Sequence, residues 1–150
     1  MNIYNLTREK LEEYFVNHGS KKFHADQLFS WLYEKRISSV SEVTDIKKEM
    51  LEQLSKDFSF SKLELVQVER DVDVCKYLFE LSDHEHIEAV LMRHDYGNSV
   101  CISSQVGCNM GCRFCESGRR KKVRNLETWE MVTQLLMIEE DLGARVSHVV

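Results

Sequence analysis

The chain has 150 residues, of which 43% are hydrophobic and 30% charged. This composition predicts a globular protein of about one domain's length, and it excludes a disordered chain. No apolar run reaches the roughly 18 residues of a membrane-spanning helix, and the first residues lack a secretory signal, so we expect a cytoplasmic protein with no membrane partner. The net charge of −5 gives no global attraction for nucleic acid, so any RNA contact must be local.

The first third of the chain has apolar residues at helical spacing. Thr7 predicts the N-cap of a first helix, which should stop at Gly19. Two more helices are expected from apolar stripes. These stripes are Leu28, Trp31 and Leu32 in the second helix, and Ile46, Met50, Leu51 and Leu54, following Thr44, in the third. We therefore predict a small helical domain over residues 1–58, with these stripes as its core.

From Leu63 onward the apolar pattern changes to a period of two, which predicts β-strands. Strands are expected from Leu63 and over residues 74–81, 87–92 and 99–105, with turns at 82–85 and 95–98. Residues 59–98 should thus form a β extension that follows the helical domain. Cys75 lies within an apolar strand pattern and is interpreted as a packing residue.

Residues 99–150 predict a strand, a long loop, a helix and a second strand, which together make a βαβ unit. The helix is expected over residues 128–142, closed by Gly143, and the last strand over residues 146–150. No turn or polar tail follows that strand, and the chain contains no proline. We therefore expect the sequence to be a piece of a longer protein.

Three cysteines lie within eight positions of the long loop, at Cys108, Cys112 and Cys115, and two others lie elsewhere in the chain. An odd number of closely spaced cysteines indicates metal or redox chemistry in a reducing compartment. Three thiolates on a [4Fe–4S] cluster leave one iron free to bind S-adenosylmethionine, from which a 5′-deoxyadenosyl radical can be made. Phe114, just before the last cysteine, fits this cofactor-binding pattern.

A zinc site is the alternative, because thiolates also bind Zn²⁺. Closed zinc sites usually take four ligands from two separated pairs, and here the second pair is missing. Cys101 or His148 could supply a fourth ligand. The basic stretch after the loop is likewise open to two interpretations, an RNA contact or a solvated surface. Its residues are Arg119, Arg120, Lys121, Lys122 and Arg124, with Arg113 inside the loop.

The cysteine spacing and its flanks resemble the RlmN/Cfr-type radical SAM RNA (adenine) methyltransferases. The resemblance extends over residues 101–108, 114–118 and 124–127, and it includes residues 23–33, which are similar to the amino-terminal helical domain of that family. It implies an α+β/α/β fold with three parts. These are a helical RNA-binding accessory domain over residues 1–58, a β extension over 59–98, and the first βαβ unit of a radical SAM (β/α) partial barrel over 99–150.

The resemblance also implies roles for individual residues. Cys108, Cys112 and Cys115 would bind the [4Fe–4S] cluster. Cys101 matches the cysteine that resolves a covalent protein–RNA adduct by forming a disulfide with a methyl-carrying cysteine. Glu88 matches the acid–base residue that removes the adenine proton, although by itself it reads equally well as the exposed face of a strand. The Gly-Glu-Pro motif and the methyl-accepting cysteine of the family are absent from these 150 residues.

In function the resemblance implies methylation of C2 of adenosine in 23S ribosomal RNA and tRNA, by a protein that is a monomer at full length. S-adenosylmethionine would serve as methyl donor and radical source. The alternatives are a Cfr-type C8 methyltransferase, a different radical SAM enzyme, and a non-catalytic, zinc-stabilised RNA-binding module. Because two family motifs are missing, this piece alone is expected to be inactive.

Overall fold

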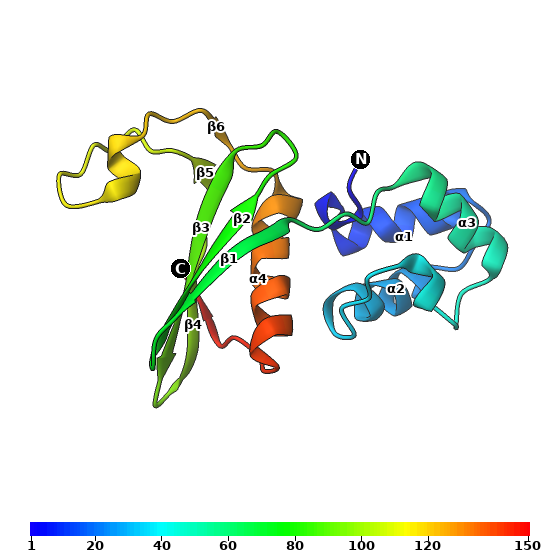
Figure 1. Ribbon diagram of the computed structural model, residues 1–150. Coiled ribbons are helices and arrows are strands. Elements are labelled where there is room, and N and C mark those ends of the chain that lie inside the picture. The colour runs from blue at the N-terminus through cyan, green and yellow to red at the C-terminus, as the bar shows by residue number, and fades with distance from the viewer. The chain divides into compact units, whose positions relative to one another are not determined.

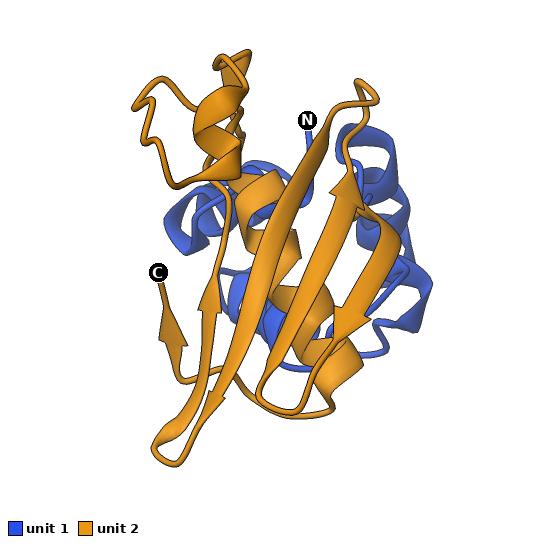
Figure 2. Ribbon diagram, turned by 60° about the vertical axis from the view of Figure 1, so that its left-hand side comes forward, with its two compact units in different colours: residues 1–61 blue, residues 62–150 orange.

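A computed structural model describes residues 1–150 and divides the chain into two compact units (Figure 2). The first unit comprises Met1–Ser61 and the second comprises Lys62–Val150. None of the helices combines the length and the apolar character that crossing a membrane requires.

The first unit is helical, as its apolar stripes predicted. It contains α1 (Arg8–Asn17), α2 (Phe23–Tyr33), α3 (Lys48–Asp57) and the short 3₁₀ helices η1 (Ile3–Asn5) and η2 (Val40–Glu42). The hydroxyl of Thr7 accepts a hydrogen bond from the Lys10 amide at 3.4 Å, which confirms the predicted N-cap. Gly19 follows α1 with a φ of +71°, a conformation that glycine adopts without strain.

The third helix starts later than predicted. We expected it to follow Thr44 and to include Ile46, but α3 begins at Lys48. The side chain of Asp45 accepts a hydrogen bond of 2.7 Å from the Trp31 indole, which holds this segment against α2 in a non-helical conformation. Ile46 is nevertheless buried, so it contributes to the core from outside the helix.

The second unit is a five-stranded sheet in the order β1-β2-β3-β4-β7, with one long helix on it (Figure 1). The bounds of its elements are β1 Glu64–Arg70, β2 Val74–Glu80, β3 His86–His94, β4 Gly97–Cys101, β5 Gln105–Val106, η3 Glu116–Arg119, β6 Arg124–Asn125, α4 Thr128–Leu142 and β7 His148–Val149. The first four sheet strands are antiparallel neighbours, and β7 pairs with β4 in parallel. A parallel pair joined through α4 confirms the predicted βαβ unit.

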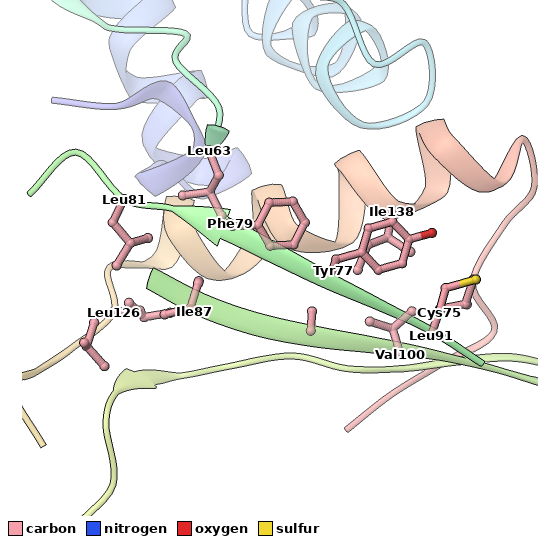
Figure 3. Packing of buried hydrophobic residues seen from close by; sticks show 12 residues of the cluster. Leu63, Cys75, Tyr77, Phe79, Leu81, Ile87, Leu91, Val100, Leu126 and Ile138 are labelled. Carbon is pink, nitrogen blue, oxygen red and sulfur yellow. The ribbon is translucent and has the colours of Figure 1, made fainter. Parts of the chain in front are cut away.

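One face of the sheet packs against α4 and forms the core (Figure 3). Every second residue of β2 and β3 points toward this core, as the strand period requires. The buried residues include Cys75, Tyr77, Phe79, Ile87, Ala89, Leu91, Val100 and Ile138. Cys75 is 1% exposed, which agrees with its prediction as a packing residue. The opposite face of the sheet lacks α4 and carries the side chains that alternate with these.

The predicted strand over residues 99–105 is wrong in its second half. β4 ends at Cys101, and the chain resumes extended pairing only in β5, which forms a separate two-stranded ribbon with β6. The amide side chain of Gln134 on α4 takes the place of a neighbouring strand here. Its Oε1 accepts from the Ser103 N–H at 2.9 Å, and its Nε2 donates to the Ser103 carbonyl at 3.0 Å.

An ion pair fixes the end of α4 to the sheet. Asp141 accepts two hydrogen bonds from the Arg70 guanidinium, at 2.6 and 2.8 Å, and one of 2.7 Å from the Tyr77 hydroxyl. The Arg70 hydrogen bonds, aided by that of Tyr77, lower the pKa of Asp141. A depressed folded-state pKa stabilises the fold above the unfolded pKa, and this stabilisation is lost as the pH falls through the folded pKa.

We therefore expect Asp141→Asn to reduce the pH dependence of folding in acid. Between about pH 5 and pH 3 the free energy of unfolding should fall less steeply in the variant than in the unmodified chain. Urea unfolding at several pH values measures this, and Asp95→Asn, which removes an exposed turn carboxylate, controls for net charge. An equally steep fall in Asp141→Asn would contradict the assignment.

Candidate functional site

Two of the predicted site residues lie on the sheet face that α4 leaves open. Val90 of β3 stands directly opposite Cys101 of β4, so their side chains share one face of the sheet. Glu88 lies two residues before Val90 and therefore points to the same face. Its carboxylate is half exposed and forms an ion pair of 3.4 Å with Lys76 on the neighbouring strand. Cys101 is exposed, with a free thiol.

The break after β4 connects this face to the cysteine loop. Ser103 donates its hydroxyl hydrogen to the Glu88 carbonyl at 2.7 Å, while its backbone is held by Gln134. Gln134 is completely buried and also donates to the carbonyl of Glu130 at 3.1 Å. The segment after Cys101 is thus held by the Ser103 hydroxyl, by a backbone hydrogen bond of 3.0 Å from Ile102 to Val150, and by the buried Gln134 amide, which no sequence pattern singled out.

Gln134→Leu is expected to lower the free energy of unfolding by about 1–3 kcal/mol, because the Ser103 N–H and C=O lose their partners in a part-buried place. Urea denaturation measures the change. Gln67→Leu on the exposed strand β1 is the matched control, since it removes the same amide from the surface. Equal stabilities of the two variants would show that the Gln134 amide does not hold the segment.

The cysteine loop projects beyond the sheet between β5 and β6 (Figures 1 and 2). Cys108, Cys112 and Cys115 are all free thiols of intermediate exposure. The Met110 amide lies 3.4 Å from the Cys108 sulfur and donates to it, and the Cys115 amide donates to the Cys112 carbonyl at 3.2 Å. Phe114 between them is 94% exposed. The loop thus presents three accessible thiols.

The donor chemistry of this loop fits an iron–sulfur cluster. The thiols are unpaired and reachable, and an amide already donates to a sulfur, a contact that favours a thiolate ligand. The side chains are not gathered into a preformed site, because no group of three or more His, Cys, Asp or Glu residues is placed to hold a metal ion. That finding covers Cys101 and His148 as well, the fourth ligands considered for zinc. Metal binding would have to draw the loop cysteines together.

An open cleft of about 700 Å³ joins the two parts of the site. It is lined by Leu78, His86, Ile87, Glu88, Ser103, Ser104, Gln105, Gly107, Cys108, Glu116, Ser117, Arg119 and Arg120. Glu88 and Cys108, which lie far apart in the sequence, both line this cleft. Cys101, Cys112, Phe114 and Cys115 do not line it. No sequence pattern predicted that Ser103 lines the cleft, whereas Arg119 and Arg120 belong to the basic stretch already considered as an RNA contact.

Ion pairs divide the basic stretch into bound and free cations. Arg119 pairs with Glu116 at 3.2 Å, Arg120 pairs with Glu85, and Arg124 binds both Asp83 and Glu130. Three cations of the loop form no ion pair, and these are Arg113, Lys121 and Lys122. Only these three therefore offer a charge that is not already balanced by a neighbouring carboxylate.

A solved structure with this arrangement defines the class of the protein. The chain is similar to a radical SAM methyltransferase from Sphaerobacter thermophilus, with a TM-score of 0.86 and 31% sequence identity, over 99% of this chain and 45% of that one. The match covers both units, which confirms the predicted fold class of a helical domain, a β extension and the start of a radical SAM barrel.

The sequence comparisons narrow this class to a family. Residues 1–59 match the family model of the ribosomal RNA large subunit methyltransferase N-terminal domain. Curated relatives described as "Probable dual-specificity RNA methyltransferase RlmN" are 49% identical in Enterococcus faecalis and 46% identical in Acholeplasma laidlawii. They match 99% and 100% of this chain, which spans 43% and 45% of their length. The chain belongs to the RlmN/Cfr-type radical SAM family and matches the amino-terminal portion of its members.

Proposed function

We propose that this chain carries the cluster-binding loop and part of the RNA site of an enzyme that methylates C2 of adenosine in 23S ribosomal RNA and tRNA through a methyl-cysteine intermediate. The observation that carries the proposal is the cleft, whose lining includes both the carboxylate-bearing Glu88 and the first loop cysteine, Cys108. Because the chain spans less than half of its relatives' length, the complete reaction is proposed for the longer protein.

Cys108, Cys112 and Cys115 are the proposed ligands of a [4Fe–4S] cluster, and Phe114 is the proposed contact to S-adenosylmethionine beside it. When bound, the two cofactors supply the one-electron chemistry that cleaves the sulfonium bond. The chain's own contribution is to hold Cys108 in the lining of the cleft, with Cys112 and Cys115 on the projecting loop, and to place Glu88 on the open sheet face. His86 and Arg120 line the same cleft and can donate hydrogen bonds to a bound nucleotide.

Glu88 is the proposed base that removes a proton from the adenine ring. Its carboxylate is half exposed and forms an ion pair with Lys76 alone, so a substrate can reach it from the cleft. Cys101 is the proposed resolving thiol, which frees the RNA by forming a disulfide with the methyl-carrying cysteine of the complete protein. Its exposure on the same sheet face as Glu88 supports that role.

Glu88→Gln in the full-length protein tests this function. The change keeps the size of the side chain and removes the base, and removing a general base typically costs about 10²–10⁴-fold in rate. Mass spectrometry of nucleosides from ribosomal RNA and tRNA measures the methylated adenosine and distinguishes C2 from C8. Glu64→Gln on the edge strand β1 is the control and should retain activity. Methylation unchanged by Glu88→Gln would contradict the proposed base, and a C8 product would support the Cfr-type alternative.

RNA is the proposed partner, contacted by Lys121 and Lys122 of the loop and by the helical first unit. Lys121→Ala with Lys122→Ala should weaken RNA binding at low salt and reduce the slope of log K against log salt by about 1–2, because each lost phosphate contact removes roughly 0.7–0.9 from it. Arg119→Ala is the control, since that cation is already paired with Glu116. A salt dependence equal to that of the unmodified protein would place the RNA elsewhere.

The five free cysteines and an RNA substrate suit the cytoplasm, which is the proposed compartment. The full-length protein is proposed to act as a monomer, which sedimentation at micromolar concentration tests directly.

A further inference from the structure

The two ends of the cysteine loop are joined in a narrow neck, defined here as residues 104–108 together with residues 120–126. Strands β5 and β6 pair across it, and three further backbone hydrogen bonds connect its two segments: the Cys108 amide donates to the Arg120 carbonyl at 2.9 Å, the Val123 amide to the Val106 carbonyl at 2.8 Å, and the Leu126 amide to the Ser104 carbonyl at 2.9 Å. At Gly107, with a φ of +68°, a Cβ atom would lie 2.2 Å from the Lys121 carbonyl oxygen. Only glycine therefore permits the two segments to approach so closely.

The neck separates the three loop cysteines into two kinds. Cys108 belongs to the neck, because its own amide makes one of the crossing hydrogen bonds. Cys112 and Cys115 belong to the tip, residues 109–119, whose internal backbone hydrogen bonds are local, such as that from Gly118 to the Cys115 carbonyl at 3.0 Å. One thiol is thus fixed by the fold, whereas the other two sit on a short projecting segment.

Two side chains join the neck to the rest of the unit: Arg120, which pairs with Glu85, and Arg124, which makes the larger set of contacts. The guanidinium of Arg124 donates to both carboxylate oxygens of Glu130, at 2.7 and 2.8 Å, to Asp83 at 2.7 Å and to the Asn125 carbonyl at 3.2 Å. Four of its five N–H groups are therefore used. Glu130 lies in the first turn of α4 and Asp83 at the tip of the β2–β3 hairpin, so Arg124 ties the neck to the helix and to the sheet.

The buried partner makes this contact strong. Glu130 is 2% exposed and also accepts from the Glu127 amide at 2.8 Å, which caps α4. A buried carboxylate requires a paired charge, and a planar guanidinium satisfies it with two parallel hydrogen bonds that a lysine ammonium cannot make. The same contacts raise the pKa of Arg124 further above its usual range, and the Arg124 hydrogen bond lowers the pKa of Asp83.

We propose that Arg124 is a positioning residue for the cluster site: it fixes the neck, and with it Cys108, before metal arrives, and Cys112 and Cys115 close onto the metal afterwards. The effect of Arg124 on cluster binding rests on the proposed cluster function. Its structural part, a neck ordered by Arg124 in the metal-free chain, stands independently of the metal that binds. On this division of roles Arg124 is structural, and it is not one of the RNA-contacting cations.

Hydrogen exchange in the metal-free 150-residue chain tests the structural part. In Arg124→Lys the amides of Cys108, Val123 and Leu126 should exchange at least about 10-fold faster, because the neck opens locally. Core amides of β2 and β3 should be unchanged. The double variant Arg124→Gln with Glu130→Gln removes the Arg124–Glu130 ion pair without leaving a buried charge unpaired. Exchange in the neck can therefore still be measured if the single variant unfolds. Arg119→Gln in the tip is the matched control. Neck amides that stay protected in the double variant would overturn the inference.

Cluster retention tests the consequence. After anaerobic reconstitution with iron and sulfide, the double variant should release its iron to a chelator at least about 10-fold faster than the unmodified chain and than Arg119→Gln. Faster neck exchange with unchanged iron release would overturn the positioning role while leaving the proposed function intact. A chain that binds zinc and no cluster would refute the proposed function, and the hydrogen-exchange result would still decide whether Arg124 orders the neck.

Discussion

Alanine at Cys108, Cys112 or Cys115 is expected to abolish the iron–sulfur cluster. The unmodified chain, purified anaerobically and reconstituted, should contain about four irons and show the brown colour of a [4Fe–4S] cluster. Each single variant should contain less than about one iron per chain, because two thiolates on so exposed a loop leave two irons without a protein ligand. The three positions should be equivalent in this respect, since each is a proposed ligand and the loop contains no other cysteine. Iron and sulfide analysis together with visible absorption measures the effect.

Cys101→Ala is the matched control, because it removes an exposed thiol of the same chain that is not a proposed ligand. It should leave the iron content unchanged. The control also separates the cluster from a zinc site in which Cys101 is the fourth ligand: a colourless chain with one zinc, lost on Cys101→Ala, would refute the cluster. Addition of S-adenosylmethionine to the reduced chain should alter the electron paramagnetic resonance spectrum if one iron remains open to it.

The elements that the sequence predicts well are those whose signals are local. The period of two in β2 and β3 comes from residues that alternate between α4 and the open face, so Glu88 could be placed on a solvent-facing strand position. The spacing of Cys108, Cys112 and Cys115 indicates metal chemistry for the same reason, since all three ligands come from one loop. Thr7 and Gly143 mark helix ends through contacts with their immediate neighbours.

The features that sequence reasoning missed depend on partners far away in the chain. Gln134 ends β4 early by binding Ser103 from 31 residues away. Arg124 belongs to the basic stretch, whose residues the sequence pattern does not distinguish from one another. Its partner Asp83 lies 41 residues earlier in the chain, and its partner Glu130 is buried. No pattern of charges along the sequence separates Arg124 from Lys122. The cleft between Glu88 and Cys108 likewise follows from strand register and the break after β4, which no local pattern encodes.

Phe79→Ala is expected to destabilise the second unit by about 3–5 kcal/mol, the usual cost of deleting a buried phenyl ring. Phe79 is completely buried on β2 between the sheet and α4, and its ring stacks on Tyr77 with centroids 6.2 Å apart (Figure 3). Domains of this size have a total stability of about 5–15 kcal/mol, so the loss is a large fraction of it. Urea unfolding followed by Trp129 fluorescence, in a Trp31→Phe background, reports on this unit alone.

Phe114→Ala deletes the same ring from the tip of the cysteine loop, where it is 94% exposed. Its effect on the free energy of unfolding should be below about 0.5 kcal/mol, as for other surface substitutions. If Phe114 contacts S-adenosylmethionine as proposed, the variant should keep its iron and require more S-adenosylmethionine to produce the same spectral change. A large loss of stability in Phe114→Ala would instead mean that the Phe114 ring packs against the protein in solution. The ring would then have a role in folding, and the proposed contact to S-adenosylmethionine would lose its support.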